Sequence, residues 1–147
     1  MNKKKQANGA LLERAIGIAV LAHRGVKDRY GAPYILHPLR VMSRVQTTNE
    51  KIVAILHDVV EDSDWTFADL RNEGFSKSLI EALDRVTRRQ SESYSQFVGR
   101  SAGNPLAKKV KIADLEDNMD VRRLPRISAK DWKRLNRYLA AWRTLQG

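Results

Sequence analysis

Residues 55–62 read ILHDVVED, and this octapeptide sets four polar side chains among apolar ones. Each of the four can bind a metal ion or carry a proton: His57, Asp58, Glu61 and Asp62. Side chains four residues apart share one face of a helix, so a helical octapeptide puts His57 beneath Glu61. Asp58 lies beneath Asp62 in the same way. The remaining residues are apolar, so we expect a largely buried helix, in which imidazole and carboxylate groups are costly unless paired or bound to metal.

Length and composition indicate one globular domain. The chain has 147 residues, of which 42% are hydrophobic and 30% charged, and a chain of this size buries roughly 68–70% of its unfolded surface. It has no cysteine, which excludes disulfides, zinc–thiolate sites and thiol nucleophiles and fits a reducing compartment. The basic start, MNKKKQANG, precedes no apolar h-region, and no run of about 18 apolar residues follows. We therefore expect a cytoplasmic protein without a secretory signal or membrane span.

The formal net charge of +10 is unevenly distributed. Residues 57–69 hold five acidic residues and no Lys or Arg, whereas residues 122–143 hold eight basic residues and one acid, Asp131. This basic half could steer phosphorylated anions toward a metal site. A solvated helical surface is the simpler explanation. Nucleic acid is not an expected partner, because no aromatic-interleaved basic motif or known nucleic-acid module is visible.

Apolar residues recur at helical spacing along almost the whole chain, and strand-like alternation is weak everywhere. The stripe at 11–22 predicts a first helix ending near His23, and the Gly- and Pro-punctuated residues 24–34 predict a loop. Starts of later helices are expected at Thr47–Asn49, Pro38, Thr66 with Asp69, Ser76, Asn104-Pro105, and Ser128 with Asp131. The sequence therefore predicts an all-α domain over residues 9–147, a single bundle of about seven or eight helices, after a basic N-terminal tail at 1–8.

Two further residues complete a candidate metal site. His37 stands where a loop becomes a helix, so its ring can point inward, and Asp114 lies among apolar residues in VKIADLEDNMD. With His57 and Asp58 they would supply two imidazoles and two carboxylates, a set that suits Mn, Fe, Co, Ni or Zn better than calcium. Taken singly, His37 would be a cap or core histidine and Asp114 a surface acid. His23, at the end of the first helix, is expected to be a C-terminal cap rather than a site residue.

Three blocks in this chain resemble the HD-domain phosphohydrolases, specifically the hydrolase domain of the RelA/SpoT family and its free-standing small alarmone hydrolases. The blocks are AHRGVKDRYGAPYILHP (22–38), ILHDVVEDS (55–63) and VKIADLEDNM (110–119). The HD dipeptide alone is unspecific, but the three blocks together, in family order, form a specific pattern that runs from roughly residue 23 to 119. The resemblance implies a helical HD domain.

The resemblance also implies roles for the matched residues. Those that match the family's metal ligands, with Mn²⁺ the usual ion, are His37, His57, Asp58 and Asp114. Glu61 and Asp62 match its acidic catalytic pair, and Asn118 matches the asparagine of its NM block. The implied reaction removes the 3′-pyrophosphate from guanosine 3′,5′-bis(diphosphate), or (p)ppGpp, by attack of a metal-activated water. Glu61 is our first choice for the carboxylate that positions or deprotonates this water, and Asp62 is the alternative.

The departures from the family pattern concern the substrate. Val26 and Asp28 stand where a glutamine and a guanine-contacting arginine are usual. Asp117 stands where histidine is usual, and is expected either to be solvated or to pair with Arg122 or Arg123. The loop residues expected to form either a plain surface or a clamp over phosphate or base are Arg24, Lys27, Arg29 and Tyr30.

Three functions stay open at this point. The first is hydrolysis of (p)ppGpp, the second hydrolysis of another nucleotide phosphoester, and the third a non-catalytic domain that binds nucleotides or nucleic acid. The expected partner is a small phosphorylated nucleotide, and we expect no synthetase domain within these 147 residues. Exposed aromatic residues on the last helix, which carries Trp132, Tyr138 and Trp142, would favour a homo-oligomer.

Overall fold

The computed structural model describes residues 3–147, which form nine α-helices and one 3-10 helix. Their bounds are α1 (Lys3–Ala22), α2 (Leu36–Ser43), α3 (Thr48–Leu56), α4 (Val59–Asp62), α5 (Phe67–Asn72), α6 (Lys77–Val86), α7 (Tyr94–Ala102), α8 (Pro105–Asn118), η1 (Val121–Arg123) and α9 (Ala129–Gln146). Within the described residues, an isolated bridge between Lys27 and Pro33 is the only strand-like pairing. The predicted all-α fold is confirmed, and counting the short α4 with α3 gives eight helices.

The first helix begins earlier than predicted. α1 starts at Lys3, so residues 3–8 continue the helix instead of forming a separate tail, while residues 1–2 lie outside the described part of the chain. Lysine, glutamine and alanine dominate this stretch, and all three are good helix formers. No break in α1 therefore marks the expected domain boundary at residue 9.

Side-chain caps determine where most of the helices begin, as the sequence predicted for several of them. In a capping box, the cap side chain accepts from the N3 amide while the N3 side chain accepts from the cap amide. Four such boxes are present: Thr47 with Glu50, Thr66 with Asp69, Ser93 with Gln96, and Ser128 with Asp131. Ser76 caps α6, and Asn104 caps α8 ahead of Pro105. Local sequence alone thus sets the starts of these helices.

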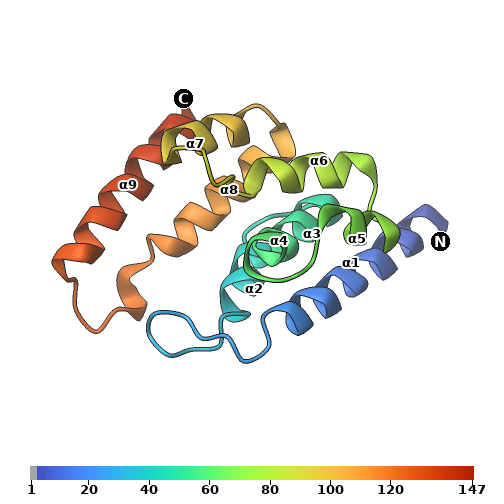
Figure 1. Cartoon of the computed structure of the whole chain (residues 1–147), viewed down its shortest axis with the longest axis horizontal. Helices are drawn as coiled ribbons and strands as arrows, with labels where there is room; N and C mark the ends of the chain where they lie inside the picture. The colour runs from blue at the N-terminus through green and yellow to red at the C-terminus, as the bar shows by residue number, and fades with distance from the viewer. Residues whose placement is uncertain (1–2) are drawn as a thin grey trace.

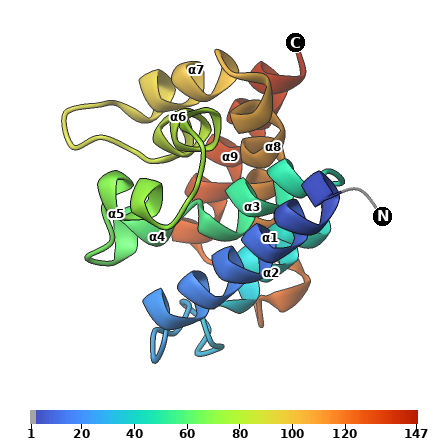
Figure 2. The ribbon, with the colours of Figure 1, turned by 90° about the vertical axis from the view of Figure 1, so that its right-hand side faces the viewer.

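α3 lies at the centre of the bundle, where it packs against α1, α2, α6 and α8 (Figure 2). Its residues from Ile52 to Leu56 are each no more than 1% exposed, so no face of this segment meets solvent. This explains why the sequence there is an unbroken apolar run. The buried end of α3 delivers the next residue, His57, into the interior.

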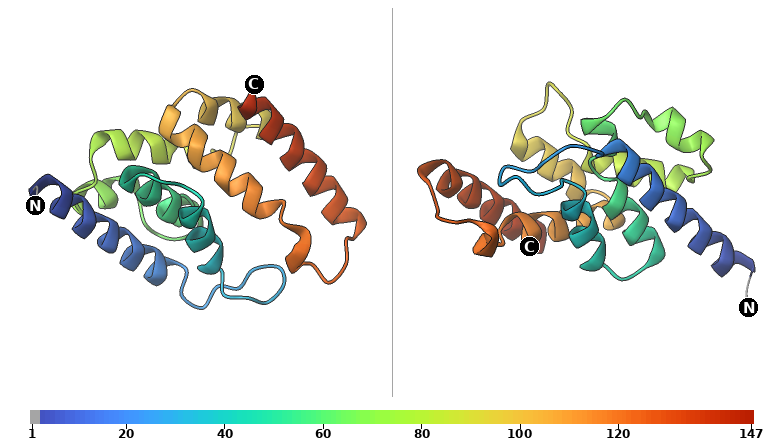
Figure 3. Two further views of the ribbon diagram at one scale, coloured as in Figure 1. Left: turned by 180° about the vertical axis from the view of Figure 1, so that it is seen from behind. Right: turned by 90° about the horizontal axis from the view of Figure 1, so that it is seen from below.

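A second, smaller core cluster joins α9 to α7 and α8 through Val98, Leu115, Ala141 and Leu145. α9 consequently runs alongside α8 at one side of the molecule (Figures 1 and 3). The loop between α1 and α2 and the η1 segment lie at the same end of the bundle in these views. None of the helices in residues 3–147 has the length and apolarity needed to cross a membrane.

Candidate metal centre

The octapeptide 55–62 is not one continuous helix, contrary to the prediction. α3 ends at Leu56, His57 and Asp58 form a turn, and α4 begins at Val59. Asp58 has φ −104° and ψ −2°, away from the ideal helical values. Neighbouring side chains on an unbroken helix point about 100° apart. The turn instead brings Nε2 of His57 within 3.1 Å of Oδ2 of Asp58.

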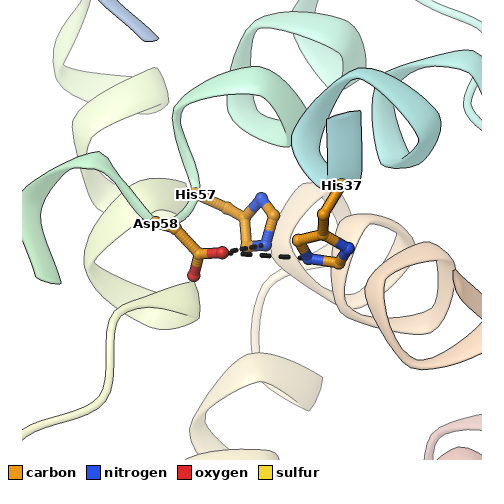
Figure 4. Close-up of side chains that lie close together, drawn as sticks. All are labelled: His37, His57 and Asp58. Atoms are coloured by element: carbon orange, nitrogen blue, oxygen red, sulfur yellow. Dashed lines mark ion pairs between the residues drawn. The ribbon is translucent and has the colours of Figure 1, made fainter. Parts of the chain in front are cut away.

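The four side chains expected to hold a metal ion lie together. Nε2 of His37, at the start of α2, is 3.0 Å from Oδ1 of Asp114 in α8, and Nε2 of His57 is 3.5 Å from the same oxygen. Oδ2 of Asp58 is also 3.8 Å from Nε2 of His37. Figure 4 shows His37, His57 and Asp58 converging, and these three form a group that could hold a metal ion. Asp114 is not part of that group of three, but its Oδ1 lies against the Nε2 atoms of both histidines.

The hydrogen bonds of the two histidines are compatible with metal binding through their Nε2 atoms. Nδ1 of His57 lies 2.6 Å from the carbonyl oxygen of Ala54, and Nδ1 of His37 lies 2.7 Å from Oδ2 of Asp117. A carbonyl or carboxylate oxygen only accepts, so both Nδ1 atoms donate, and a neutral ring then keeps its lone pair on Nε2. Nε2 of His57 is buried and makes no hydrogen bond within the described residues, although Asp58 is close. This donor set fits a divalent metal ion.

Asp114 is held by two neighbours on its own helix. Lys111, one turn earlier, donates from Nζ to Oδ2 at 2.8 Å, and Asn118, one turn later, donates from Nδ2 to Oδ1 at 3.0 Å. Burial raises the pKa of Asp114, but Lys111, His37 and His57 outweigh it and hold the pKa well below the usual value. Asp114 is therefore an anion that is fixed in direction. The sequence prediction placed Asn118 at the site but did not assign Lys111 this role.

Tyr34 and His23 lie beside the cluster, and neither was predicted as a site residue. The Tyr34 hydroxyl donates to Oδ2 of Asp58. His23 is 2% exposed, and its ring centroid is 5.0 Å from that of Tyr34. Neither ring nitrogen of His23 has a hydrogen-bond partner among the described residues, so His23 is not the helix cap that was expected. The packed pair closes the α1 side of the cluster.

Glu61 and Asp62, the expected catalytic acids, sit on α4 next to the cluster. Glu61 accepts from the backbone amide of Arg88 at 3.0 Å. Desolvation in the pocket and the charge of Asp58 raise the pKa of Glu61, and the same causes, with Glu61 itself, raise the pKa of Asp62 to about 6. A carboxylate whose pKa approaches neutrality is a more effective proton acceptor than an ordinary one. The raised pKa values favour proton uptake by both carboxylates, and by Asp62 in particular.

A pocket of about 640 Å³ opens over the cluster. It is lined by Asp58, Asp114, both expected catalytic acids and Asn118. Its basic lining comes from several elements: Lys27, Arg29, Arg40, Arg88, Lys111, Arg123, Arg134 and Arg137. Tyr138 of α9 also lines it while packing on the smaller core cluster. The basic C-terminal helix thus forms one wall of the pocket.

The loop between α1 and α2 forms another wall. Lys27, Arg29 and Tyr30 line the pocket, whereas Arg24 is not among its lining residues. The carboxylate of Asp28 accepts from the backbone amides of Tyr30 and Ala32 at 2.9 and 3.0 Å. Asp28 therefore stabilises the turn of its own loop.

Asp117 is not the solvated acid that was one of its predicted alternatives, and it has partners besides the expected arginine. It is fully buried and accepts from His37 at 2.7 Å and from Nε of Arg40 at 2.8 Å. The expected pairing with Arg123 is present, through Nη1 at 3.4 Å. Arg122 instead bonds Asp120. Closeness in sequence placed Asp117 near Arg123, but its partner His37 is 80 residues away in sequence.

Comparison with known proteins gives consistent sequence matches. The chain is 30% identical over 120 residues to a guanosine-3′,5′-bis(diphosphate) 3′-pyrophosphohydrolase of Aquifex aeolicus, which is 74% of this chain and 17% of the relative. It is 32% identical over 121 residues to a GTP pyrophosphokinase of Streptomyces coelicolor (74% and 14%). It is 28% identical over 123 residues to the bifunctional (p)ppGpp synthase/hydrolase SpoT of Escherichia coli (74% and 17%). The chain thus spans about a sixth of the length of these curated relatives.

A solved structure shares the fold. It is a metazoan ortholog of SpoT, described as hydrolysing ppGpp and playing a role in starvation responses. The TM-score is 0.77 at 23% identity, covering 94% of this chain and 86% of the other. No protein-family model matches the chain. Over about three quarters of its sequence this chain is therefore similar to the RelA/SpoT-type enzymes named above, and it shares the fold of the metazoan SpoT ortholog.

Proposed function

We propose that this chain is a metal-dependent phosphohydrolase that acts on a phosphorylated nucleotide, with (p)ppGpp as substrate and Mn²⁺ as metal ion. The observation that carries the proposal is the group of His37, His57 and Asp58, with Asp114 against both histidines, in a pocket lined by eight cationic side chains. The relatives named above as pyrophosphohydrolases support the choice of substrate.

The metal ion would be held by His37, His57, Asp58 and Asp114. Bound there, it would act as a Lewis acid that polarises a phosphate oxygen and acidifies water. Mixed nitrogen and oxygen ligands with open positions are compatible with Mn²⁺ and leave room for substrate.

Two carboxylates next to the ligands would handle the proton. The Arg88 amide holds one oxygen of Glu61, which keeps this side chain beside Asp58 and makes Glu61 the proposed base. Asp62, whose pKa is raised to about 6, is the alternative acceptor. Asn118 would act through Asp114, whose oxygen it already binds.

The cationic lining would bind the phosphates. Lys27 and Arg29 approach from the loop, Arg88 from the segment after α6, and Arg137 from α9. These four come from three separate parts of the chain, which suits a substrate with phosphates at more than one position. With ppGpp, addition of water to the 3′-diphosphate would give GDP and pyrophosphate.

A second candidate substrate is another nucleotide phosphoester. The Asp28 carboxylate accepts hydrogen bonds from its own loop, so position 28 has no cationic side chain that could stack on a base. An Mn²⁺-supplemented screen of ppGpp, deoxynucleoside monophosphates and cyclic dinucleotides, with product identification, tests both. Release of pyrophosphate and GDP from ppGpp supports the first candidate, and turnover of only another nucleotide supports the second.

If the chain is instead a non-catalytic binding domain, we expect a different result. Protein purified without added metal would then contain no transition metal by elemental analysis, would bind RNA and would hydrolyse none of the nucleotides. The cytoplasmic location and the homo-oligomer expected from the sequence stay predictions. Trp132 on α9 is 57% exposed, which keeps an interface there open to test by sedimentation.

A further inference from the structure

Asp117 connects the candidate metal centre to the arginines around it. It lies three residues after Asp114 on α8, so one helix supplies both a proposed metal ligand and a buried acid behind another ligand. Oδ2 of Asp117 accepts the Nδ1 proton of His37 at 2.7 Å. Nε2 of the same ring is 3.0 Å from Asp114. The imidazole of His37 thus spans from one carboxylate of α8 to the other.

The two histidines of the cluster are held in different ways. His57 donates its Nδ1 proton to the neutral carbonyl of Ala54, whereas His37 donates to the charged Asp117. A carboxylate behind an imidazole fixes the tautomer and the ring direction, and makes the other nitrogen a stronger metal ligand. Loss of such a partner typically weakens metal affinity about 10- to 100-fold.

Three arginines surround the carboxylate of Asp117, which is inaccessible to solvent. Its Oδ1 lies 2.8 Å from Nε of Arg40, 3.4 Å from Nη1 of Arg123 and 3.7 Å from Nη2 of Arg44. Burial raises the pKa of Asp117, but the hydrogen bonds from His37 and Arg40 lower it to about 2. A buried carboxylate without such partners would take up a proton and lose its charge.

We propose that Asp117 is a positioning residue that holds the proton on Nδ1 of His37 and so raises the affinity of the site for its metal ion. The inference rests on the proposed metal site. Asp117 stands where histidine is usual in the family that the motifs resemble, so this contact is a property of this chain. No nucleotide contact is assigned to Asp117.

The test is the affinity of purified Asp117→Asn protein for Mn²⁺ alone, measured by calorimetry and by the electron paramagnetic resonance signal of free Mn²⁺. Asparagine keeps the size of the side chain and removes its charge. We expect binding about 10- to 100-fold weaker than in the unmodified protein. The matched control is Asp84→Asn, because the Asp84 carboxylate pairs with Arg89 and contacts neither His37 nor the arginines around Asp117. Its Mn²⁺ affinity should be unchanged.

Two outcomes separate this inference from the proposed function. If the unmodified protein does not bind Mn²⁺, the metal site fails and the inference fails with it. If the unmodified protein binds Mn²⁺ and Asp117→Asn binds it equally well, only the role of Asp117 is overturned.

A measurement on the unmodified protein covers the case in which Asp117→Asn does not fold. Nitrogen-15 NMR of the metal-free protein at alkaline pH, where imidazole is neutral, reports which nitrogen of His37 carries the proton. The chain has three histidines, so single substitutions assign the signals. A proton on Nδ1 is expected. A proton on Nε2 would overturn the inference, because Nδ1 would then not donate to Asp117.

Discussion

Nε2 of His57 lies 3.1 Å from Oδ2 of Asp58, its neighbour in the chain, because the backbone turns between α3 and α4. An unbroken helix would direct the two side chains about 100° apart. The turn therefore lets adjacent residues serve one site while α3 stays buried and α4 carries Glu61 and Asp62 beside it.

Glu61→Gln should lower kcat by about 10²- to 10⁴-fold, the usual contribution of a general base. Affinity for Mn²⁺ should be unchanged, because Glu61 is beside the proposed ligands and not among them. Steady-state kinetics and calorimetry on the same protein check both parts. Glu81→Gln, at an exposed position of α6, serves as the control. Undiminished turnover by Glu61→Gln would exclude this residue as the base.

Affinity for Mn²⁺ should rise with pH. Burial lowers the pKa of His57, but the charges of Asp58 and Asp114 outweigh it and raise the pKa well above the usual value. The pKa of His37 is also raised, since hydrogen bonds to Asp114 and Asp117 outweigh burial. Below these raised pKa values a metal ion must displace protons, so binding is weak at acid pH and strengthens as the pH passes them. Calorimetric titrations across the pH range would detect this, and a flat profile would contradict the assignment of the two histidines.

Lys27→Ala should raise KM about tenfold, which corresponds to loss of one charge-assisted phosphate contact. Arg24→Ala removes a cation three residues away that does not line the pocket, so its KM should stay unchanged. Kinetics with the substrate found in the nucleotide screen compare the two variants. Equal increases in KM for the two variants would mean that long-range charge attraction, and not contact with a residue lining the pocket, explains substrate binding.

Leu83→Ala should lower the free energy of unfolding by about 2–5 kcal/mol, because Leu83 is 1% exposed in the main core. Leu21→Ala makes the same change at a position that is 59% exposed, so its unfolding free energy should change little. Urea denaturation followed by circular dichroism measures both. Similar losses for the two variants would be inconsistent with the described core.

The fold was predictable because its signals are local. The apolar spacing indicated helices, and the capping pairs at Thr66 and Ser128 marked where two of them begin. The turn at His57 was not predictable, because the apolar spacing of ILHDVVED continues through it. The turn is accompanied by contacts from a distant part of the sequence, because the Tyr34 hydroxyl donates a hydrogen bond to Asp58.

The site was predictable only in part, for the same reason. Motif order indicated which histidines and aspartates to group, although their distances depend on how α2, α3 and α8 pack. No motif in the sequence indicated that Asp117 contacts His37 or that Arg137 lines the pocket. Asp117 meets a histidine from a distant segment, and Arg137 lines the pocket because α9 packs on α8 through Leu115 and Leu145.

Asp58→Ala shows whether the cluster holds a metal ion that phosphohydrolysis needs. Mn²⁺ content by elemental analysis and release of pyrophosphate from ppGpp would be measured on the unmodified protein, on Asp58→Ala and on the exposed control Asp64→Ala. We expect bound Mn²⁺ and turnover in the unmodified protein and the control, and loss of both in folded Asp58→Ala. Full turnover by metal-free Asp58→Ala would show that the reaction does not need a metal ion in this cluster.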